Sequence, residues 1–588
     1  MTYRTHTCNQ LTKKEIGKKV ILSGWNLSRR DHGGLIFIDL RDRYGLTQLA
    51  FDPKHNKKAH QVAESLTRED VITIEGKVRS RPKGMANPKL ATGDVEVLVD
   101  KINIFSKSKT PPIEIDDRIE SSEETRLKYR YLDLRRPKMF NNLKFRNDCT
   151  KSAREFFDQN DFIEVETPLL MKATPEGARD YVVPSRTVPG KFFALPQSPQ
   201  LYKQILMVAG FDRYYQIARC LRDEDLRSDR QPEHTQMDFE MSFVTAEEVM
   251  EFVENLYKHI TKKVKNITIK EKFPVLTFDE SMEKYGTDKP DLRYNLKLTN
   301  VSDVVKDSDF KVFKDIVASG GLVKCINPEQ DLPRKEIDAL IDFCIKAGAK
   351  GMAWMRVTDK GLESNIAKFF SPAIQKKILA KTKAKKDSIL MFIADKPSVC
   401  NNVLNLLRQE LASRLKLIKP NEFKYCWVVD YPLFEKDEDT DAWIPCHHIF
   451  SKPKDESIQY LEKDPGKVKA DLFDIVLNGT ELGSGSIRIS QPDLQRRVMK
   501  VIGLDEKEAD KKFGFLLKAY EYGGPPHGGM GLGFDRLVTL LLGLEDIREV
   551  IAFPKNKNAE CPMDGCPSDI TDEQFKDLHI KSNVVKKQ

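Results

Sequence analysis

The chain lacks the segments that mark membrane and secreted proteins. No apolar run reaches the roughly 20 residues that a membrane-spanning helix needs. Residues 1–10 are polar and contain no apolar core of the kind found in signal peptides. We therefore predict a soluble protein of the cytoplasm that has no membrane partner.

The cysteines form no recognisable metal-binding or disulfide framework. Ten cysteines are scattered over 588 residues, and no Cys-x-x-Cys occurs. Cys561 and Cys566 lie close together, but they have no matching second pair and no neighbouring histidine. Reduced thiols are therefore the preferred interpretation, and a zinc site is the less favoured alternative.

The common nucleotide-binding fingerprints are also missing. Neither the Gly-x-x-x-x-Gly-Lys of a P-loop nor the glycine pattern of a dinucleotide fold is present. Instead, residues 211–225 predict a strand that delivers Arg222 into an acidic loop. Residues 531–536 predict a glycine-rich strand end that passes Arg536 into a helix. Each arginine is a planar fork of donors, so the two suit two different phosphates of one nucleotide.

Size and charge set broad limits. A chain of 588 residues should hold about four domains. Charged residues make up 32% of the chain, and the formal net charge is +8. A positive excess of this size is compatible with a polyanionic partner, although local basic patches decide binding more than the sum does.

Residues 1–106 are typical of a small β-barrel. Five short apolar runs separated by turn residues predict strands, with a helix between the third and fourth. The predicted strands are 20–25, 35–40, 46–51, 71–78 and 95–105, and the helix is 57–66. This order fits a Greek-key barrel of the OB type, whose open face binds oligonucleotides. The basic run 126–136 that follows is either a solvated hinge face or a contact with nucleic acid.

The rest of the chain predicts one domain interrupted by another. Apolar residues recur at helical spacing over 145–157, and this helix gives way to a strand that ends at Pro168. Lysine-rich helices dominate residues 281–420, where no catalytic constellation is visible. Because the segments on either side complete one another's motifs, we predict that this stretch is an inserted domain.

Further strings define the family more closely than the two arginine segments do. The arginine segments resemble motifs 2 and 3 of the class II aminoacyl-tRNA synthetases, and the helix and strand before Pro168 resemble motif 1. The more specific strings are residues 173–180, 195–203, 285–293, 478–488 and 525–529. With them, the chain resembles the bacterial-type aspartyl-tRNA synthetases (subclass IIb) over essentially its whole length.

The resemblance implies a multidomain α+β fold and a homodimer. An N-terminal OB-type β-barrel would bind the anticodon, and a class II catalytic domain on an antiparallel sheet would carry an inserted α+β domain similar to the GAD domain. The expected boundaries are 1–106 for the barrel, 107–135 for a hinge, 136–280 and 421–555 for the two catalytic parts, 281–420 for the insertion and 556–588 for a C-terminal extension.

The resemblance also implies a reaction and its catalytic residues. ATP would activate L-aspartate as an aspartyl-adenylate, and the aspartyl group would pass to tRNA(Asp). Such chemistry depends on positioning and charge stabilisation. Arg222 would contact the α-phosphate and Arg536 the γ-phosphate. Asp474 and Glu481 would hold Mg²⁺, which prefers oxygen ligands. The implied catalytic residues are Arg222, Glu481 and Arg536, and further ATP-binding positions are Asp223, Glu224, Gln231, Gly533, Phe534 and Asp535.

A second implied set of residues binds the amino acid. Aspartate and asparagine are nearly isosteric, so a site separates them best by surrounding the side-chain carboxylate with cations. Lys203 and Arg488 match the positions that do this in the family, with His447 as a third donor. Asp238 would bind the α-ammonium group. The remaining members of the implied site are Glu176, Ser198, Gln200 and Arg222.

The barrel carries the implied anticodon site. Phe37 would normally belong to the core, but the resemblance places it outward, stacked on an anticodon base. Such a stack contributes roughly 1–3 kcal/mol. Gln48 would read the central base, and Arg30 and Glu96 would lie on the same surface.

Two barrel positions bear on which tRNA is charged. Relatives that charge only tRNA(Asp) commonly carry leucine and lysine where this chain has His32 and Gly84. Relatives that also charge tRNA(Asn) often carry histidine and glycine there. We therefore expect an enzyme that charges both tRNAs, with strict tRNA(Asp) specificity as the alternative.

Two other functions compete with this interpretation. Asparagine or lysine as the amino acid is disfavoured by Lys203 and Arg488, because lysine would require acids and asparagine needs no such positive charge. A catalytically inactive RNA-binding protein is disfavoured by the retention of Arg222, Glu481 and Arg536.

Overall fold

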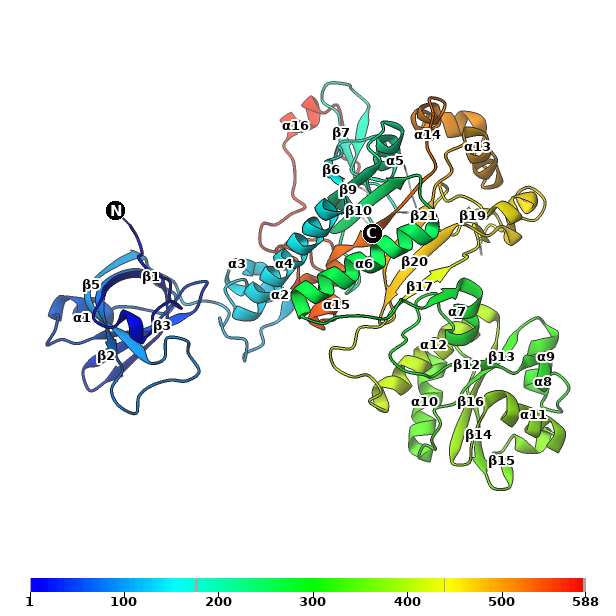
Figure 1. Ribbon diagram of the computed structural model, residues 1–588, viewed down its shortest axis with the longest axis horizontal. Helices are drawn as coiled ribbons and strands as arrows, with labels where there is room; N and C mark the ends of the chain where they lie inside the picture. The colour runs from blue at the N-terminus through cyan, green and yellow to red at the C-terminus, as the bar shows by residue number, and fades with distance from the viewer. Residues whose placement is uncertain (1, 175–177, 438, 585–588) are drawn as a thin grey trace. The chain divides into compact units, whose positions relative to one another are not determined.

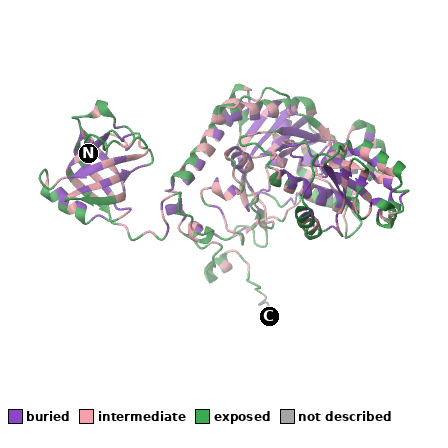
Figure 2. Ribbon diagram, turned by 90° about the horizontal axis from the view of Figure 1, so that it is seen from below, coloured by how far each residue is buried: buried purple, intermediate pink, exposed green. Residues whose placement is uncertain are grey.

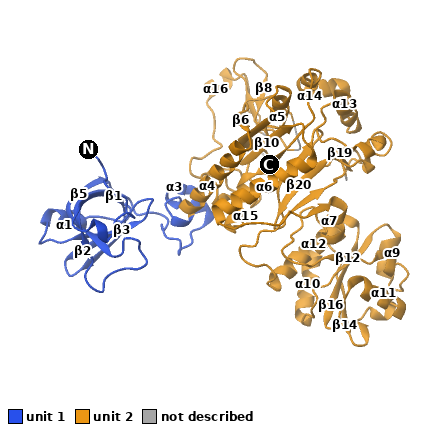
Figure 3. Ribbon diagram, viewed as in Figure 1, with its two compact units in different colours: residues 1–138 blue, residues 139–588 orange. Residues whose placement is uncertain are grey.

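The computed structural model describes residues 2–174, 178–437 and 439–584, and the chain divides into two compact units (Figures 1 and 3). The first unit is residues 1–138 and the second is residues 139–588. In both units buried strands lie inside and the outer faces of the helices are exposed (Figure 2). Among the described residues, no helix combines the length and apolar composition needed to cross a membrane.

The first unit contains a closed five-stranded barrel with the strand order β1-β2-β3-β5-β4. Along β2 (Leu35–Arg41), Ile36, Ile38 and Leu40 are buried, whereas Phe37 is only partly buried and lies outside the barrel core. This alternation is the period of two that strands impose. The other elements are β1 (Lys19–His32), β3 (Leu46–Phe51), α1 (Lys57–Glu64), β4 (Val71–Ser80) and β5 (Val95–Ser106). The predicted OB-type barrel is confirmed.

The basic segment after the barrel is folded around one buried acid. It forms α2 (Glu123–Lys128) and α3 (Arg130–Asp133). Asp133 is fully buried and pairs with three guanidinium groups, those of Arg126 at 3.0 Å, Arg130 at 2.6 Å and Arg136 at 3.0 Å. Burial would raise the pKa of Asp133, but Arg126 and its neighbours lower it overall. Several arginines of the basic run are therefore engaged in ion pairs with a buried carboxylate.

The second unit is built on an eight-stranded sheet with the order β11-β17-β20-β21-β22-β10-β9-β6. All neighbouring strands are antiparallel except the pairs β11–β17 and β6–β9. The strands are β6 (Ile163–Glu164), β9 (Arg213–Leu221), β10 (Glu233–Ser242), β11 (Val275–Thr277), β17 (Tyr425–Val429), β20 (Leu472–Leu477), β21 (Thr480–Ile487) and β22 (His527–Gly533). The predicted class II sheet is confirmed.

Helix α6 (Ala246–Lys265) covers this sheet because it presents an apolar stripe to the sheet core. In α6, Val249, Val253, Leu256 and Ile260 recur every three or four residues and are fully buried. The other helices of this region are α4 (Pro137–Gln159), α5 (Gln200–Val208), α13 (Pro492–Val501), α14 (Glu506–Tyr520), α15 (Phe534–Leu542) and α16 (Asp572–Asp577). Two small hairpins complete it, β7 (Val182–Pro184) with β8 (Phe192–Ala194) and β18 (Phe434–Lys436) with β19 (Trp443–Pro445).

The segment between β11 and β17 forms a second sheet with its own apolar cores. Its strand order is β12-β13-β16-β14-β15. The strands are β12 (Leu298–Asn300), β13 (Leu322–Ile326), β14 (Ala353–Thr358), β15 (Gly361–Glu363) and β16 (Ser388–Asp395). The helices are α7 (Phe278–Tyr285), α8 (Ser302–Val305), α9 (Lys311–Ala318), α10 (Arg334–Lys346), α11 (Pro372–Thr382) and α12 (Pro397–Arg414).

The buried acid of the first unit gives a stability prediction. Asp133→Ala leaves three arginines without their shared partner, so the unit should lose roughly 3–5 kcal/mol of unfolding free energy. Trp25 is the only tryptophan within residues 1–138, but the second unit holds three more. The measurement is therefore urea denaturation of a variant whose other three tryptophans are replaced by phenylalanine. Asp116→Ala, which breaks an exposed pair with Arg118, should leave the transition unchanged. Equal transitions for both variants would contradict the role of Asp133.

Candidate active site

The two arginines singled out by the sequence reach one pocket. Arg222 directly follows β9, and Arg536 lies in the first turn of α15, which continues from β22. Both line a cavity of about 370 Å³ in the second unit. The Nε of Arg222 is buried without a hydrogen-bond partner among the described residues. Arg536 donates to the Glu481 carbonyl oxygen at 3.2 Å and contacts Asp229 at 3.2 Å.

The pKa of a histidine in the cavity wall reflects the positive charge of this cavity. The pKa of His234 is lowered to about 3, first by burial and then by Arg222, Arg536 and Arg219. The imidazole is therefore neutral at pH 7, because a further positive charge is unfavourable there. A cavity in which cations are crowded and one guanidinium nitrogen is unpaired is suited to polyphosphate.

Two carboxylates on a neighbouring hairpin provide oxygen ligands for a cation. Asp474 lies on β20 and is fully buried, and its Oδ1 has no hydrogen-bond partner among the described residues. Glu481 is the second residue of the facing strand β21 and lines the cavity. Its Oε2 lies 3.4 Å from Nζ of Lys289. Hard oxygen donors beside a phosphate pocket fit Mg²⁺, so the two acids suit the ion expected from the sequence.

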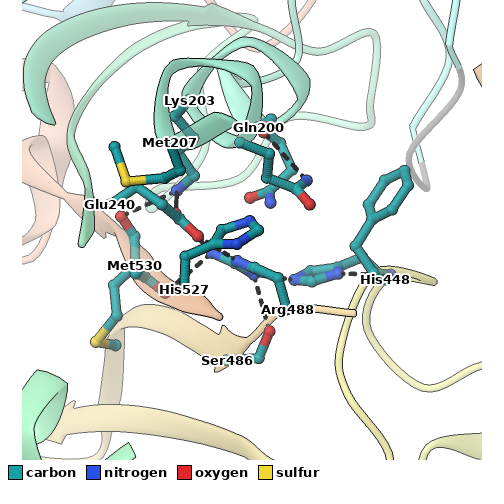
Figure 4. A network of polar contacts seen from close by, with 12 residues as sticks. Gln200, Lys203, Met207, Glu240, His448, Ser486, Arg488, His527 and Met530 are labelled. Carbon is teal, nitrogen blue, oxygen red and sulfur yellow. Dashed lines mark hydrogen bonds and ion pairs between the residues drawn. The ribbon is translucent and has the colours of Figure 1, made fainter. Parts of the chain in front are cut away.

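A buried ion-pair network lies behind the cavity (Figure 4). Arg488 on the chain after β21 uses all five of its N–H donors. It donates to Glu240 through Nε at 2.8 Å and Nη2 at 3.2 Å, and to the Gly529 carbonyl at 2.9 Å. Nη1 contacts Ser486 Oγ at 2.8 Å and His448 Nε2 at 2.9 Å. This set of contacts fixes the guanidinium group in one orientation.

Lys203 links the network to a carboxylate that faces the cavity. Its Nζ lies 3.0 Å from Asp238 Oδ1 and 3.4 Å from Glu240 Oε2. Burial would raise the pKa of Glu240, but Arg488 and Lys203 lower it overall. Burial raises the pKa of Asp238 in spite of Lys203. Asp238 lines the cavity, and its Oδ2 is without a hydrogen-bond partner among the described residues.

Glycine at position 529 makes this arrangement sterically possible. Gly529 faces Glu240 across the β10–β22 pair. A β-carbon at position 529 would collide with the Phe239 carbonyl oxygen and with the Glu240 carboxylate. Only glycine therefore allows β22 to approach β10 closely enough for the Gly529 carbonyl to accept from Arg488.

The two adjacent histidines point to different partners. His447 Nε2 lies 3.2 Å from Asp474 Oδ2, whereas His448 contacts Arg488. Burial alone would lower the pKa of His447, but Asp474 raises it well above its ordinary value. Burial and then Arg488 lower the pKa of His448 well below its ordinary value. The structure therefore associates His447 with the Asp474 carboxylate and His448 with the ion-pair network.

Most residues predicted from the sequence meet in this cavity. Those that line it are Ser198, Gln200, Arg222, Glu224, Gln231, Asp238, His447, Glu481, Gly533, Asp535 and Arg536. Lys203, Arg488 and Asp474 lie behind its wall rather than in it. Glu176 falls outside the described residues.

Two predicted ATP-binding side chains point elsewhere. Asp223 lies 3.5 Å from Arg179, and Phe534 belongs to the apolar core, 4.9 Å beneath the Arg146 guanidinium. Neither lines the cavity among the described residues. Asp535 accepts from the Thr235 backbone N–H at 2.7 Å, so it also braces α15 against β10.

Two functional candidates, Glu240 and Lys289, were missed from the sequence. Each contacts a predicted site residue. The signal for Glu240 was available, because residues two apart on a strand share a face and Asp238 was already chosen. The contact of Lys289 depends on how distant segments fold together.

The barrel brings Arg30, Gln48 and Glu96 together, but Glu96 is buried rather than on the predicted surface. Arg30 contacts Gln48 at 3.4 Å, and Gln48 donates to Glu96 at 2.8 Å. The rings of Phe37 and His32 lie 6.2 Å apart. Gly84 lies in a separate loop with φ of +84°, and a β-carbon there would meet no atom within 4 Å.

Comparison with known proteins matches both units of the chain. Residues 122–557 match the family described as tRNA synthetases class II (D, K and N), and residues 20–105 match the OB-fold nucleic acid binding domain. A Caldanaerobacter subterraneus protein named aspartate–tRNA(Asp/Asn) ligase is 51% identical over 583 residues, covering 99% of this chain and 98% of its own. A Macrococcus caseolyticus protein named aspartate–tRNA ligase is 49% identical over 587 residues, with 99% of both chains covered.

A solved structure shares the fold at low sequence identity. The asparaginyl-tRNA synthetase of Pyrococcus horikoshii, complexed with asparaginyl-adenylate, aligns with a TM-score of 0.59 and 19% identity. The alignment covers 93% of this chain and 97% of that one.

The low pKa of His234 can be tested directly. Arg222→Leu removes a positive charge beside the imidazole, so the His234 pKa should rise from about 3 towards its ordinary value. NMR titration of labelled histidine side chains measures this pKa. Arg154→Leu, which removes a surface arginine paired with Glu164, should leave the pKa of His234 unchanged. An unchanged His234 pKa in the Arg222 variant would disprove the electrostatic argument.

The buried network predicts a large loss of stability when one of its charges is removed. Glu240→Gln keeps the shape of the side chain but leaves Arg488 and Lys203 with too little negative charge. The second unit should lose roughly 3–5 kcal/mol of unfolding free energy. The matched control Glu233→Gln lies on the same strand but is half exposed, and it should change stability by less than about 0.5 kcal/mol. Urea denaturation, monitored by tryptophan fluorescence, measures the stability of each variant. Equal stability of Glu240→Gln and the native protein would refute the prediction.

Proposed function

The chain belongs to the aspartate–tRNA ligases among the class II tRNA synthetases, and from this premise we propose that it attaches L-aspartate to tRNA(Asp) and also to tRNA(Asn). The choice of aspartate as the amino acid rests on one observation: two buried cationic side chains are paired with two buried carboxylates. Lys203 and Arg488 are matched by Asp238 and Glu240, beside the cavity that Asp238 lines.

Exchange of ion-pair partners accounts for the preference for aspartate. The α-ammonium group of the amino acid pairs with Asp238, whose Oδ2 is available. Lys203 then needs a new partner, and the side-chain carboxylate of aspartate supplies one. Asparagine has no such charge and leaves one buried cation unmatched, which costs roughly 3–5 kcal/mol. That difference corresponds to a preference for aspartate of about two to four orders of magnitude.

Activation of the amino acid uses the positive side of the cavity. An oxygen of the aspartate α-carboxylate attacks the α-phosphorus of ATP, and the bond to the β-phosphate breaks as diphosphate leaves. Arg222 stabilises the charge that builds on the α-phosphate, and Arg536 holds the far end of the triphosphate. A hydroxyl of the terminal tRNA ribose then attacks the carbonyl of the adenylate, and AMP leaves.

The acids of the β20–β21 hairpin would hold Mg²⁺. Asp474 and Glu481 are the proposed ligands, supported by the unpaired Asp474 Oδ1 and the position of Glu481 on the cavity wall. When bound, the ion would neutralise phosphate charge. Lys289 lies against Glu481 and holds this carboxylate in place before ATP binds.

Relaxed reading of the anticodon is proposed to depend on His32 and Gly84. The two tRNAs differ at the third anticodon base, so an enzyme that tolerates both bases there charges both. His32 lies beside Phe37, the proposed stacking residue, and Gly84 leaves open space in its loop. The naming of a relative that is 51% identical as an Asp/Asn ligase supports this proposal.

A homodimer is proposed at the edge of the large sheet. β6 is the terminal strand there, and Ile163, Leu169 and Leu170 around it are half exposed. Exposed apolar residues in one place mark an interaction surface. We propose that the reaction takes place in the cytoplasm, where tRNA, ATP and aspartate are available.

Parallel aspartylation of tRNA(Asp) and tRNA(Asn) transcripts tests the function. We expect kcat/KM values within about tenfold of each other. Charging of tRNA(Asp) alone would establish the strict enzyme. ATP–diphosphate exchange driven by asparagine but not by aspartate would overturn the choice of amino acid.

The tRNA(Asn) activity should depend on two positions. His32→Leu combined with Gly84→Lys should lower kcat/KM for tRNA(Asn) at least about tenfold, equivalent to about 1.4 kcal/mol, with little change for tRNA(Asp). The matched control is His6→Leu with Gly17→Lys, because Gly17 also has a positive φ and open space around it. Equal losses with both tRNAs would show that these positions serve the barrel fold instead.

A further inference from the structure

Two cysteines face each other in the segment that follows the catalytic sheet. The backbone N–H of Cys561 donates to the Cys566 carbonyl at 2.8 Å, and the N–H of Gly565 donates to the Cys561 carbonyl at 2.9 Å. These bonds close a tight loop and place Cys561 and Cys566 opposite each other. Cys561 is buried, and Cys566 is partly exposed.

A carboxylate inside the same loop converges on the two sulfur atoms. Asp564 Oδ1 accepts from the Cys566 backbone N–H at 3.0 Å, which fixes the direction of its side chain. One ligand atom from each of Cys561, Asp564 and Cys566 lies within 4.8 Å of the other two. In a tetrahedral zinc site with Zn–S of about 2.3 Å, ligand atoms are roughly 3.7 Å apart, so small side-chain rotations suffice.

The charges around the loop suit a divalent cation. When a metal is bound, two thiolates and a carboxylate would carry three negative charges. The ammonium group of Lys555 contacts the Cys566 side chain. The ammonium group and a divalent cation together neutralise the three negative charges.

We propose that Cys561, Asp564 and Cys566 bind a thiophilic divalent cation such as Zn²⁺, with water in the fourth position. Thiolates are the soft ligands that select such metals over Mg²⁺. A disulfide between the cysteines would leave the converging carboxylate with only its hydrogen bond from the Cys566 backbone N–H. The sequence alone favoured free thiols, because Asp564 was not recognised as a third ligand.

The site is directly connected to the ATP cavity. The backbone N–H of Lys555 donates to Gln231 Oε1 at 2.7 Å, and Gln231 Nε2 donates to the Lys555 carbonyl at 3.1 Å. Gln231 lines the cavity. A cation that fixes residues 561–566 therefore holds the segment against which Gln231 is positioned, without taking part in the reaction.

Titration of the reduced full-length protein with Co²⁺ in excess Mg²⁺ tests the proposal. One equivalent of Co²⁺ should bind and produce thiolate-to-cobalt charge-transfer absorption, which Zn²⁺ then removes. Cys566→Ser should abolish the strong thiolate signal of a two-sulfur site, and Asp564→Asn should weaken binding at least about tenfold. Asp564 is exposed, so its substitution leaves the fold intact.

Matched controls separate this site from adventitious binding. Cys446 is the other partly exposed cysteine, and Asp569 is an exposed acid of the same segment. Cys446→Ser and Asp569→Asn should bind Co²⁺ as the native protein does. The proposal is overturned if the native protein shows no thiolate band, if Cys566→Ser retains the full signal, or if Asp564→Asn binds as tightly as Asp569→Asn.

Discussion

The need to balance buried charge organises the catalytic unit. Arg488 and Lys203 are almost completely buried, and so are Glu240 and Asp238. None of these groups could stay ionised there without the others, because an unpaired buried charge is strongly unfavourable. The four side chains come from α5, β10 and the end of β21, so the network fixes how three distant segments meet. The proposed amino acid site adjoins this network, because Asp238 lines the cavity.

The glycines of β22 follow from the same constraint. The strand must lie close to β10 on one side and β21 on the other, and Gly529 has no room for a side chain on the side of Glu240. The strand then enters α15, which places Arg536 over the cavity. Close backbone approach and phosphate binding are therefore two consequences of one glycine-rich strand.

The sequence predicted those features that local pattern determines. The alternation of β2 and the spacing of apolar residues in α6 identify elements because each depends only on neighbours in the chain. Arg222, Asp238, Glu481 and Arg536 were found because their motifs are distinctive. The different partners of His447 and His448 were not predicted, since they depend on Asp474 and Arg488, which are distant from the histidines in the sequence.

The sequence was also misleading where a local pattern has two meanings. A basic run predicts a nucleic-acid contact or a solvated face, but Asp133 gathers Arg126, Arg130 and Arg136 around itself. The position of Phe534 in the phosphate-binding motif suggested a nucleotide contact, whereas its ring fills the core beneath α15. In both cases the deciding partner is a buried group that composition does not reveal.

The parallel pair β11–β17 also determines the order in which the catalytic unit can be completed. These strands are neighbours in the sheet although the whole second sheet lies between them in the chain. During synthesis the ribosome releases β9 and β10 long before β20, β21 and β22, which supply the other half of the pocket. The emerging chain thus carries the buried acids of β10 without Arg488 while residues 243–487 are synthesised. Until then Lys203 of α5, which is synthesised before β10, is available to pair with these acids, while the second sheet folds around its own cores.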